Sequence, residues 1–467
     1  MTLRCVRTGE PSCQSVGVPE VLPRLLGTGD AVVLGLASML GAGVFTVFPP
    51  ATRTAGGWLP LAVVLAGVVA ACNAFSTADL AANQPESGGG YLYGRSLLAP
   101  WAGRLAGVAF LAGKTASAAA AAGVFVGYVL PTHSLWLAVL VIVVVSAMNT
   151  AGVRWTARGA WLLVPSVLAV LLVVVLAALM ARHGPTEPLT AMTDEVNVTP
   201  VTPLGVLTGA GLIFFAFAGY ARMATLSEEV RDPARTLRRA IPLALGIALI
   251  TYLAVGASLL RSLGVSGLAA ITTSPLAASV GLIEAPALGV LVRVGAAAAS
   301  ASALLSVLAG ISRTVLAMAR RHDLPRWLAA VGPRGTPWRA DIAGALASVV
   351  VAALAGPAAS VALSACCVLV YYAVINCAAL RLPVSARRWP AWTSVLGFLL
   401  CMLLAALLPR TQVVATAAVL VVGSLLSTGL AWWVGRDAIR DGPTAASYGP
   451  DTGPESPDTG PEITCPE

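Results

Sequence analysis

The stretch Ala31–Ala51, AVVLGLASMLGAGVFTVFPPA, is apolar and long enough to cross a lipid bilayer, yet Gly35, Gly41 and Gly43 lie within it. A hydrocarbon core of about 30 Å needs about 20 apolar residues in a helix. Because backbone polar groups inside a bilayer must be hydrogen-bonded, helix-weakening glycines at that depth need a structural reason. They predict either an interrupted helix or a close helix contact that only small residues permit.

A second stretch, Leu207–Val230, repeats this pattern, with Gly219 directly after a cluster of aromatic residues (LTGAGLIFFAFAGYARMATLSEEV). The two stretches are the first and the sixth apolar segments of the chain, so two inverted five-helix repeats would place them at equivalent positions. An interrupted helix exposes N–H groups that suit a carboxylate and carbonyl groups that suit an ammonium ion. Together the two stretches favour a binding site for a zwitterion in the middle of the membrane.

The composition predicts a polytopic membrane protein, because 57% of the residues are hydrophobic and only 11% are charged. Twelve apolar segments are long enough to cross the membrane as helices. They cover residues 30–48, 58–78, 104–130, 134–151, 159–181, 204–224, 239–261, 285–310, 341–356, 360–380, 391–409 and 413–434.

The distribution of arginine predicts the orientation in the membrane. With the N-terminus inside, 23 of the 28 arginines fall on the cytoplasmic side, and Arg293 falls within a span. This asymmetry follows the positive-inside rule, so both termini are expected to be cytoplasmic in a multi-pass protein of the plasma membrane. The net charge of +8 is thereby explained by topology, and no nucleic-acid partner is expected. Four arginines are expected outside: Arg53, Arg182, Arg261 and Arg410.

The sequence predicts no metal site and no cofactor. Its eight cysteines lack metal-ligand spacing, and its three histidines lie far apart in expected loops. A membrane-embedded enzyme should have clustered acidic or histidine side chains inside its spans, and a sensor should carry a soluble signalling domain. Neither is found, so both are weak alternatives. The chain contains no pattern that predicts an oligomeric state.

The single lysine of the chain, Lys114, lies in the apolar run Phe110–Phe125, FLAGKTASAAAAAGVF. A phosphate-binding loop is excluded because Gly107 and Gly113 are separated by five residues and no strand precedes them. Two interpretations remain. The long side chain could reach the cytoplasmic interface, or it could be a functional charge inside the bundle. Arg104 marks the interface ten residues earlier, or about 15 Å away along a helix, which favours the functional interpretation.

Four motifs resemble those of one family, the amino acid–polyamine–organocation (APC) permeases. Gly35–Phe45, GLASMLGAGVF, is similar to the family's first-helix signature, and Phe214–Ile241 is similar to its sixth helix and the following loop. Ser76–Leu98 and Gly310–Ile342 resemble the loops after helices 2 and 8. The resemblance covers about residues 25–435 and is greatest to permeases of high-GC Gram-positive bacteria, where arginine displaces lysine.

The resemblance implies an all-α fold with twelve transmembrane helices and a sodium-symporter-like 5+5 inverted repeat. It also implies that N–H groups near Gly41, Ala42 and Gly43 bind a substrate carboxylate, beside Ser38. The carbonyls of the sixth helix would take the amino group, and one aromatic residue there would close over the substrate. The sixth-helix site residues are Phe215, Ala216, Ala218 and Gly219, with Phe215 as the gate.

The implied organisation divides the chain into a transport core and its additions. These are a cytoplasmic segment (1–28), the core of helices 1–10 (29–382), helices 11–12 (383–435) and a disordered cytoplasmic tail (436–467).

The implied function is secondary active transport of amino acids by alternating access, coupled to protons or to exchange. A polyamine or amino acid/amine antiporter is the alternative. Two departures from the family complicate the coupling: Ala221 stands where many members have an acid, and the fifth span has no lysine. Lys114 is therefore the candidate coupling group, and Arg293 is a weaker candidate for a gate, better explained as an interfacial anchor.

Overall fold

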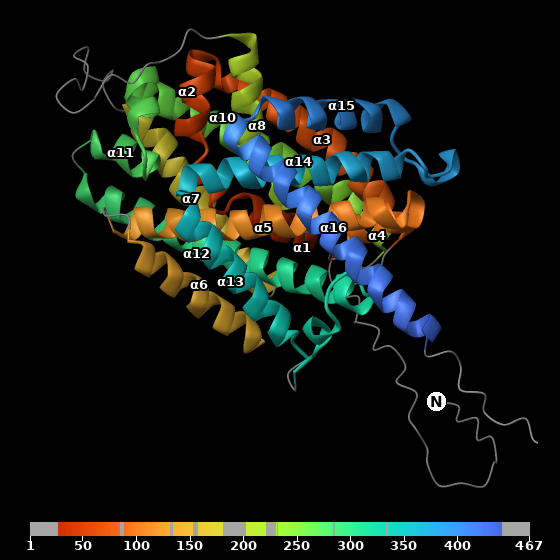
Figure 1. Ribbon diagram of the computed structural model, residues 1–467. Coiled ribbons are helices and arrows are strands. Elements are labelled where there is room, and N and C mark those ends of the chain that lie inside the picture. The colour runs from red at the N-terminus through yellow and green to blue at the C-terminus, as the bar shows by residue number, and fades with distance from the viewer. Residues whose placement is uncertain are drawn as a thin grey trace, which may run out of the picture.

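The computed structural model describes residues 27–84, 88–130, 134–152, 157–180, 202–220, 230, 232–283, 285–332 and 335–440. The regular elements of these residues are helices, with no β-strand among them (Figure 1). Most of the expected N-terminal segment and tail, and Ala221 after the sixth span, lie outside the described residues.

Many of the helices begin at a proline, which has the backbone angle of a first helical turn and lacks an N–H that would be unbonded there. The α-helices are α1 (Thr28–Met39), α2 (Phe48–Ala55), α3 (Leu59–Asn83), α4 (Gly90–Leu97), α5 (Pro100–Val129), α6 (Leu135–Thr150), α7 (Ala157–Met180), α8 (Pro203–Phe217), α10 (Pro233–Ala270), α11 (Pro275–Gly281), α12 (Pro286–Arg320), α13 (Trp338–Leu354), α14 (Pro357–Ala379), α15 (Ala391–Leu407) and α16 (Arg410–Arg440). Short 3-10 turns are η1 (Gly43–Phe45), η2 (Gly56–Trp58), η3 (Ala218–Tyr220), η4 (Arg326–Ala329) and η5 (Val384–Ala386).

The helices have the length and composition of a membrane bundle. Within the described residues, nine helical segments are long and apolar enough to cross a bilayer, and α6 and α15 are apolar but shorter. Each of the twelve apolar segments expected from the sequence overlaps one of the helices. The polytopic, all-helical class is therefore confirmed.

Several helices, α10 and α12 among them, extend beyond the apolar segments that predicted them. The segment 285–310 predicted the end of α12 ten residues too early, because the helix continues to Arg320 through charged residues that suit a region outside the bilayer. Helix α10 likewise starts at Pro233, with Asp232 at its N-cap accepting the Arg235 N–H (3.3 Å). Apolar length marks where a helix lies in lipid, whereas capping residues mark where it begins and ends.

Helix α5 runs through the bundle, with other helices around it (Figure 1). Of the thirty residues of α5, more than half are buried, and α12 and α14 pack along it. Helix α16 presents valine and leucine side chains outward instead. Such a surface suits lipid, because lipid tails do not penalise exposed apolar side chains.

The first span is interrupted as its glycines predicted. Helix α1 ends at Met39, a 3-10 turn follows at Gly43–Phe45, and α2 starts at Phe48. In the sixth span α8 ends at Phe217 and passes into the 3-10 turn Ala218–Tyr220. The residues after Tyr220 lie outside the described part of the chain. Both spans therefore leave the α-helical conformation at their glycine-containing segments.

A buried carboxylate connects the loop after α12 to α4 and to the first turns of α5. Asp323 is fully buried and accepts hydrogen bonds from the Tyr91 hydroxyl and from Arg95 Nη1, each at 2.6 Å. Arg104 Nη1 lies 3.6 Å from its other oxygen, and the Ser427 hydroxyl of α16 donates to its backbone carbonyl. Burial, together with the bond to Asp323, raises the pKa of Tyr91 above its ordinary value, so Tyr91 stays a donor.

Replacing Asp323 with alanine should lower the free energy of unfolding by about 3–5 kcal/mol, because the largely buried Arg95 and Arg104 would lose their carboxylate. Unfolding in mixed micelles with increasing SDS, followed by tryptophan fluorescence, measures the change. The control is Asp232→Asn, which removes an exposed charge while asparagine still caps α10. Equal effects of the two substitutions would contradict the role of Asp323.

Candidate functional site

The two interrupted spans touch each other at their glycines. A Cβ atom on Gly43 would lie 2.6 Å from the Cα atom of Ala216, and one on Gly219 would lie 2.3 Å from the carbonyl oxygen of Ser38. Real Cβ atoms do not approach backbone atoms this closely, so any larger residue at either position would push the two spans apart. Both explanations of the glycines therefore hold. The glycines lie where the helices are interrupted, and they also lie where the two spans make a close contact.

Tyr252 of α10 joins the ends of the same two spans. Its fully buried hydroxyl lies 2.7 Å from the Met39 carbonyl oxygen and 3.1 Å from the Ala216 carbonyl oxygen, and donates toward both. Carbonyl groups at a helix end have no partner within the helix, and inside a membrane water does not replace one. The single hydroxyl hydrogen of Tyr252 is shared between the two carbonyl oxygens, so this residue ties the ends of both spans together.

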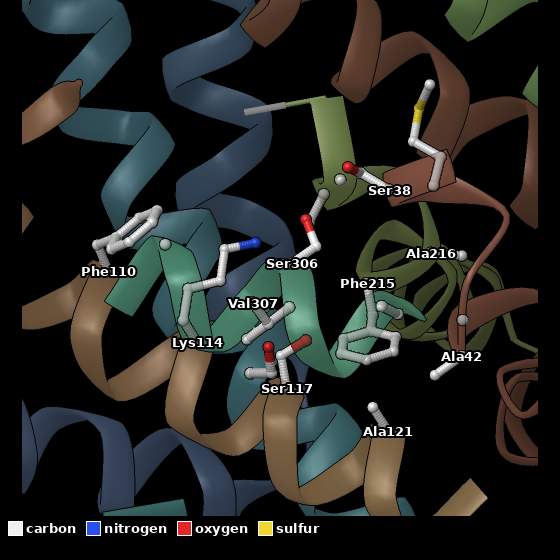
Figure 2. Close-up of a pocket in the computed structure, with 17 residues that line it drawn as sticks. Ser38, Ala42, Phe110, Lys114, Ser117, Ala121, Phe215, Ala216, Ser306 and Val307 are labelled. Carbon is white, nitrogen blue, oxygen red and sulfur yellow. The ribbon is translucent and has the colours of Figure 1, made fainter. Parts of the chain in front are cut away.

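A cavity of about 70 Å³ lies beside this contact (Figure 2). Its wall is formed by α1 and the turn after it, α5, the end of α8 with η3, α12 and α14. The lining residues are Ser38, Met39, Ala42, Gly43, Phe110, Lys114, Ser117, Ala121, Phe215, Ala216, Ala218, Gly219, Ala303, Ser306, Val307, Gly310 and Ser364. A buried water molecule needs about 10–15 Å³ by such a measure, so the space suits a small solute.

The cavity brings together most of the residues that the sequence singled out. Ser38, Ala42 and Gly43 line it from the first span, and Phe215, Ala216, Ala218 and Gly219 line it from the sixth. Gly41 does not line it; a Cβ atom there would lie 2.5 Å from that of Ala303, so Gly41 is where α12 packs. That these residues bind a substrate stays a prediction.

Arg293 lies apart from the cavity. It is exposed on α12, on a surface that also exposes Val290 and Val294, and it is not among the lining residues. This position fits an anchor at the membrane interface better than a gate.

Lys114 lies in the middle of α5 and lines the cavity. Its Nζ atom is 5.7 Å from the centre of the Phe110 ring, one turn earlier on the same face. Figure 2 shows the side chain extending from α5 toward Ser306 on α12. The lysine is thus directed into the bundle beside the interrupted spans and not toward the cytoplasmic interface.

The sequence interpretation missed the other side chains of this wall. Phe110, Lys114, Ser117 and Ala121 follow one another at spacings of four, three and four residues, which places them on one helix face. Starting from Lys114, that spacing would have identified them. Ser306 and Ser364 come from α12 and α14, and their approach depends on tertiary packing that no local pattern reveals.

Tyr128 fastens the interrupted first span near the far end of α5. Its hydroxyl donates to the Phe45 carbonyl (3.1 Å) and accepts the Leu276 N–H of α11 (3.4 Å), and its ring meets that of Phe45 edge to face.

A second cavity of about 20 Å³ borders Phe45, Tyr128 and Ser274. Val124 and Tyr128 follow Ala121 by three and seven residues, so this small cavity lies roughly 5–10 Å farther along α5.

The wall of the cavity beside the two spans offers groups that could hold the charged or polar groups of a solute. Among the described residues, no group of three histidine, cysteine or acidic side chains lies close enough together to hold a metal ion. Helices α1 and α8 both end at the cavity, and helix C-termini carry partial negative charge that attracts a cation such as an ammonium group. Lys114 and the serine hydroxyls can bind an anionic or hydrogen-bond-accepting group on the opposite wall.

Replacing Tyr252 with phenylalanine should destabilise the protein by about 1–3 kcal/mol, because two buried carbonyl groups lose their donor. The matched control is Tyr93→Phe, since the Tyr93 hydroxyl is buried and the described residues give it no hydrogen-bond partner. Thermal unfolding of the purified proteins in detergent compares them. A loss of stability that is as large in Tyr93→Phe as in Tyr252→Phe would contradict the bridging role.

Comparison with known proteins identifies the family of this chain. The amino acid permease family model matches residues 26–434. An uncharacterized transporter of Mycobacterium tuberculosis is 46% identical over 410 residues, which cover 87% of this chain and 91% of the relative.

More distant relatives carry substrate names. A chloroplastic cationic amino acid transporter of Arabidopsis thaliana is 24% identical over 349 residues, covering 69% of this chain and 59% of the relative. A branched-chain amino acid permease of Bacillus subtilis is 24% identical over 349 residues, covering 67% and 70%. The chain belongs to the amino acid permease family of the APC superfamily, whose members are transporters and not enzymes.

Proposed function

We propose that this transporter is a secondary active permease that moves amino acids across the plasma membrane by alternating access. The observation that carries the proposal is the cavity at the contact between the two interrupted spans. Amino acids are zwitterions, and the site offers groups for both of their charges. Backbone N–H groups near Gly41, Ala42 and Gly43 would bind the carboxylate, beside Ser38.

The ammonium group would bind to carbonyls at the end of α8. Phe215, Ala216 and Ala218 are the candidates, and the Ala216 carbonyl already accepts from Tyr252. A carbonyl oxygen has two lone pairs, so it can accept a second hydrogen bond from the substrate. Phe215 lines the same space, beside Gly219, and would close over the bound molecule as a gate.

Alternating access would follow from two inverted repeats of five helices, with residues 29–382 as the transport core and 383–435 as two added helices. The interruption of the first span and the 3-10 turn at the end of α8 support this arrangement. The contact of Tyr128 with Phe45 and with the Leu276 N–H would close the outer end of the pathway. The distribution of arginine supports cytoplasmic termini.

The energy source would be a proton gradient or exchange of one substrate for another. Lys114 is the candidate coupling group, because it is the one ionisable side chain among the described residues that line the cavity. An ionisable group at this depth is costly unless it has a function. The names of the relatives include both cationic and branched-chain amino acids. A polyamine or amino acid/amine antiporter is the alternative function.

Purified protein in liposomes should take up at least one radiolabelled amino acid faster than empty liposomes do, and an inward proton gradient should accelerate uptake. A protonophore should remove the acceleration. If no amino acid is taken up or exchanged, the proposed function is wrong. If the protein takes up or exchanges amino acids at a rate that does not depend on the proton gradient, the proposal of proton coupling is wrong, but the proposal of amino acid transport is still supported.

Lys114→Met and Lys114→Arg should both lose the pH dependence of uptake, with rates under the gradient falling at least tenfold. Methionine carries no proton, and arginine keeps its proton at every physiological pH. Uptake between pH 5 and 8 measures the effect. Transport with unchanged pH dependence in either variant would exclude Lys114 as the coupling group.

A further inference from the structure

A short strap, residues 265–274, crosses the end of α5 that carries Tyr128. The residue before it and its last residue both turn through the left-handed region of backbone conformation, since Gly264 has a φ of 70° and Ser274 a φ of 38°. A Cβ atom on Gly264 would meet open space, so this glycine is explained by its backbone angle and not by close packing. A serine at such an angle is strained, and strained residues are typical of segments that switch position.

The base of the strap is held together by two serines. The Ser262 hydroxyl on α10 lies 2.7 Å from the Ser279 hydroxyl on α11, and both side chains are buried. Because these serines flank the two left-handed turns, the strap is a loop whose ends are fixed close to each other. The residues between the turns can then swing as one segment.

Arg53 joins the strap to the second half of the first span. From the last turn of α2, its Nε atom donates to the Ala269 carbonyl (2.7 Å), and its Nη2 atom lies 3.5 Å from the Ile271 carbonyl oxygen. The carbonyls at the end of α10 carry partial negative charge, so they suit an arginine. Helix α2 therefore holds the strap near its middle through a charge-assisted hydrogen bond.

The strap rests on α5 at Gly127. A Cβ atom on Gly127 would lie 3.6 Å from the Cβ atom of Thr273, which is an ordinary van der Waals contact. Residues 272–274 border the small cavity beside Phe45 and Tyr128. A van der Waals contact is weaker than a charge-assisted hydrogen bond, so the strap should separate from α5 more easily than from α2.

We propose that the strap moves with the second half of the first span and leaves α5 when the outer end of the pathway opens. Arg53 is the positioning residue that couples the two. The inference rests on the proposed function, because it describes how the cavity of that function is reached. When α2 moves outward, Arg53 carries the strap away from Gly127, and the turns at Gly264 and Ser274 absorb the rotation.

Two engineered disulfides test the movement, each in a variant whose eight native cysteines are replaced. Gly127→Cys with Thr273→Cys would fix the strap to α5, because a separation of 3.6 Å between Cβ atoms is within the range that a disulfide spans. Oxidation should reduce amino acid uptake into liposomes at least tenfold, and dithiothreitol should restore it. The matched control is Ser262→Cys with Ser279→Cys, which fixes only the base of the strap and should leave uptake unchanged.

The coupling role of Arg53 has a separate readout, which is the reaction of Thr273→Cys with a methanethiosulfonate reagent in lipid nanodiscs. Arg53→Gln should slow this reaction about threefold, because the strap then stays on α5 while α2 moves. Arg53→Lys should keep the rate, since lysine also donates to the carbonyls of a helix end. If Arg53 only stabilised the fold, its loss would loosen the strap and speed the reaction instead.

Uptake that is unchanged by the disulfide between positions 127 and 273 would overturn the moving strap and leave amino acid transport intact. An equal loss of uptake with the control disulfide would also overturn it. If the reduced Gly127→Cys/Thr273→Cys protein does not transport, a bulky reagent on Thr273→Cys alone should hold the strap off α5 and abolish uptake, and unchanged uptake would overturn the proposal. An unchanged or faster reaction in Arg53→Gln would exclude Arg53 as the coupling residue. Failure of the wild type to take up any amino acid would instead overturn the proposed function.

Discussion

The architecture of the site depends on how closely the two interrupted spans approach each other. Gly43 lies against Ala216 and Gly219 lies against Ser38, at distances that leave no space for another Cβ atom. This contact brings the ends of α1 and α8 together and places their free backbone groups beside one cavity. The surrounding helices α5, α12 and α14 then complete a wall that no single pair of spans could form.

Interrupting a helix inside a membrane is costly unless the freed backbone groups find new partners. Two tyrosines provide them here. Tyr252 serves the carbonyls of Met39 and Ala216 at the contact between the spans, and Tyr128 serves the carbonyl of Phe45 at the turn beyond it. A hydroxyl on a rigid ring suits this role, because it reaches a backbone carbonyl without bringing a charge into the bilayer. These bonds let the first span depart from the helix and still remain ordered.

The fold class could be predicted from the sequence because lipid imposes simple rules. Length and apolarity located the spans, and glycine at midspan located the interruption between Met39 and Phe48. The start of α10 and the end of α12 were harder to predict, because they extend beyond the apolar segments. Hydropathy identifies the part of a helix that lies in lipid. It does not indicate where a helix ends when that helix continues outside the bilayer.

The candidate site could be predicted only in part. Glycines and the single lysine stood out because each breaks a local rule, and the structure places Gly43, Gly219 and Lys114 on one cavity. No such local signal exists for Tyr252, Ser306 and Ser364, because tyrosine and serine are common in membrane helices. The sequence around them therefore did not identify them as site residues. Gly41 shows the opposite problem: it shares the motif but packs against Ala303, because neighbouring residues in a turn face different partners.

The central claim is that substrate occupies the cavity at the contact of the two interrupted spans. The most direct measurement is chemical labelling of Ser117→Cys, a lining position, in a variant whose eight native cysteines are replaced. A transported amino acid should slow the reaction of this cysteine with a small methanethiosulfonate reagent. It should leave the labelling of Ala138→Cys unchanged, since Ala138 borders a separate cavity that is lined by α5, α6 and residues 352–357. Equal labelling rates at Ser117→Cys with and without saturating substrate would contradict the claim.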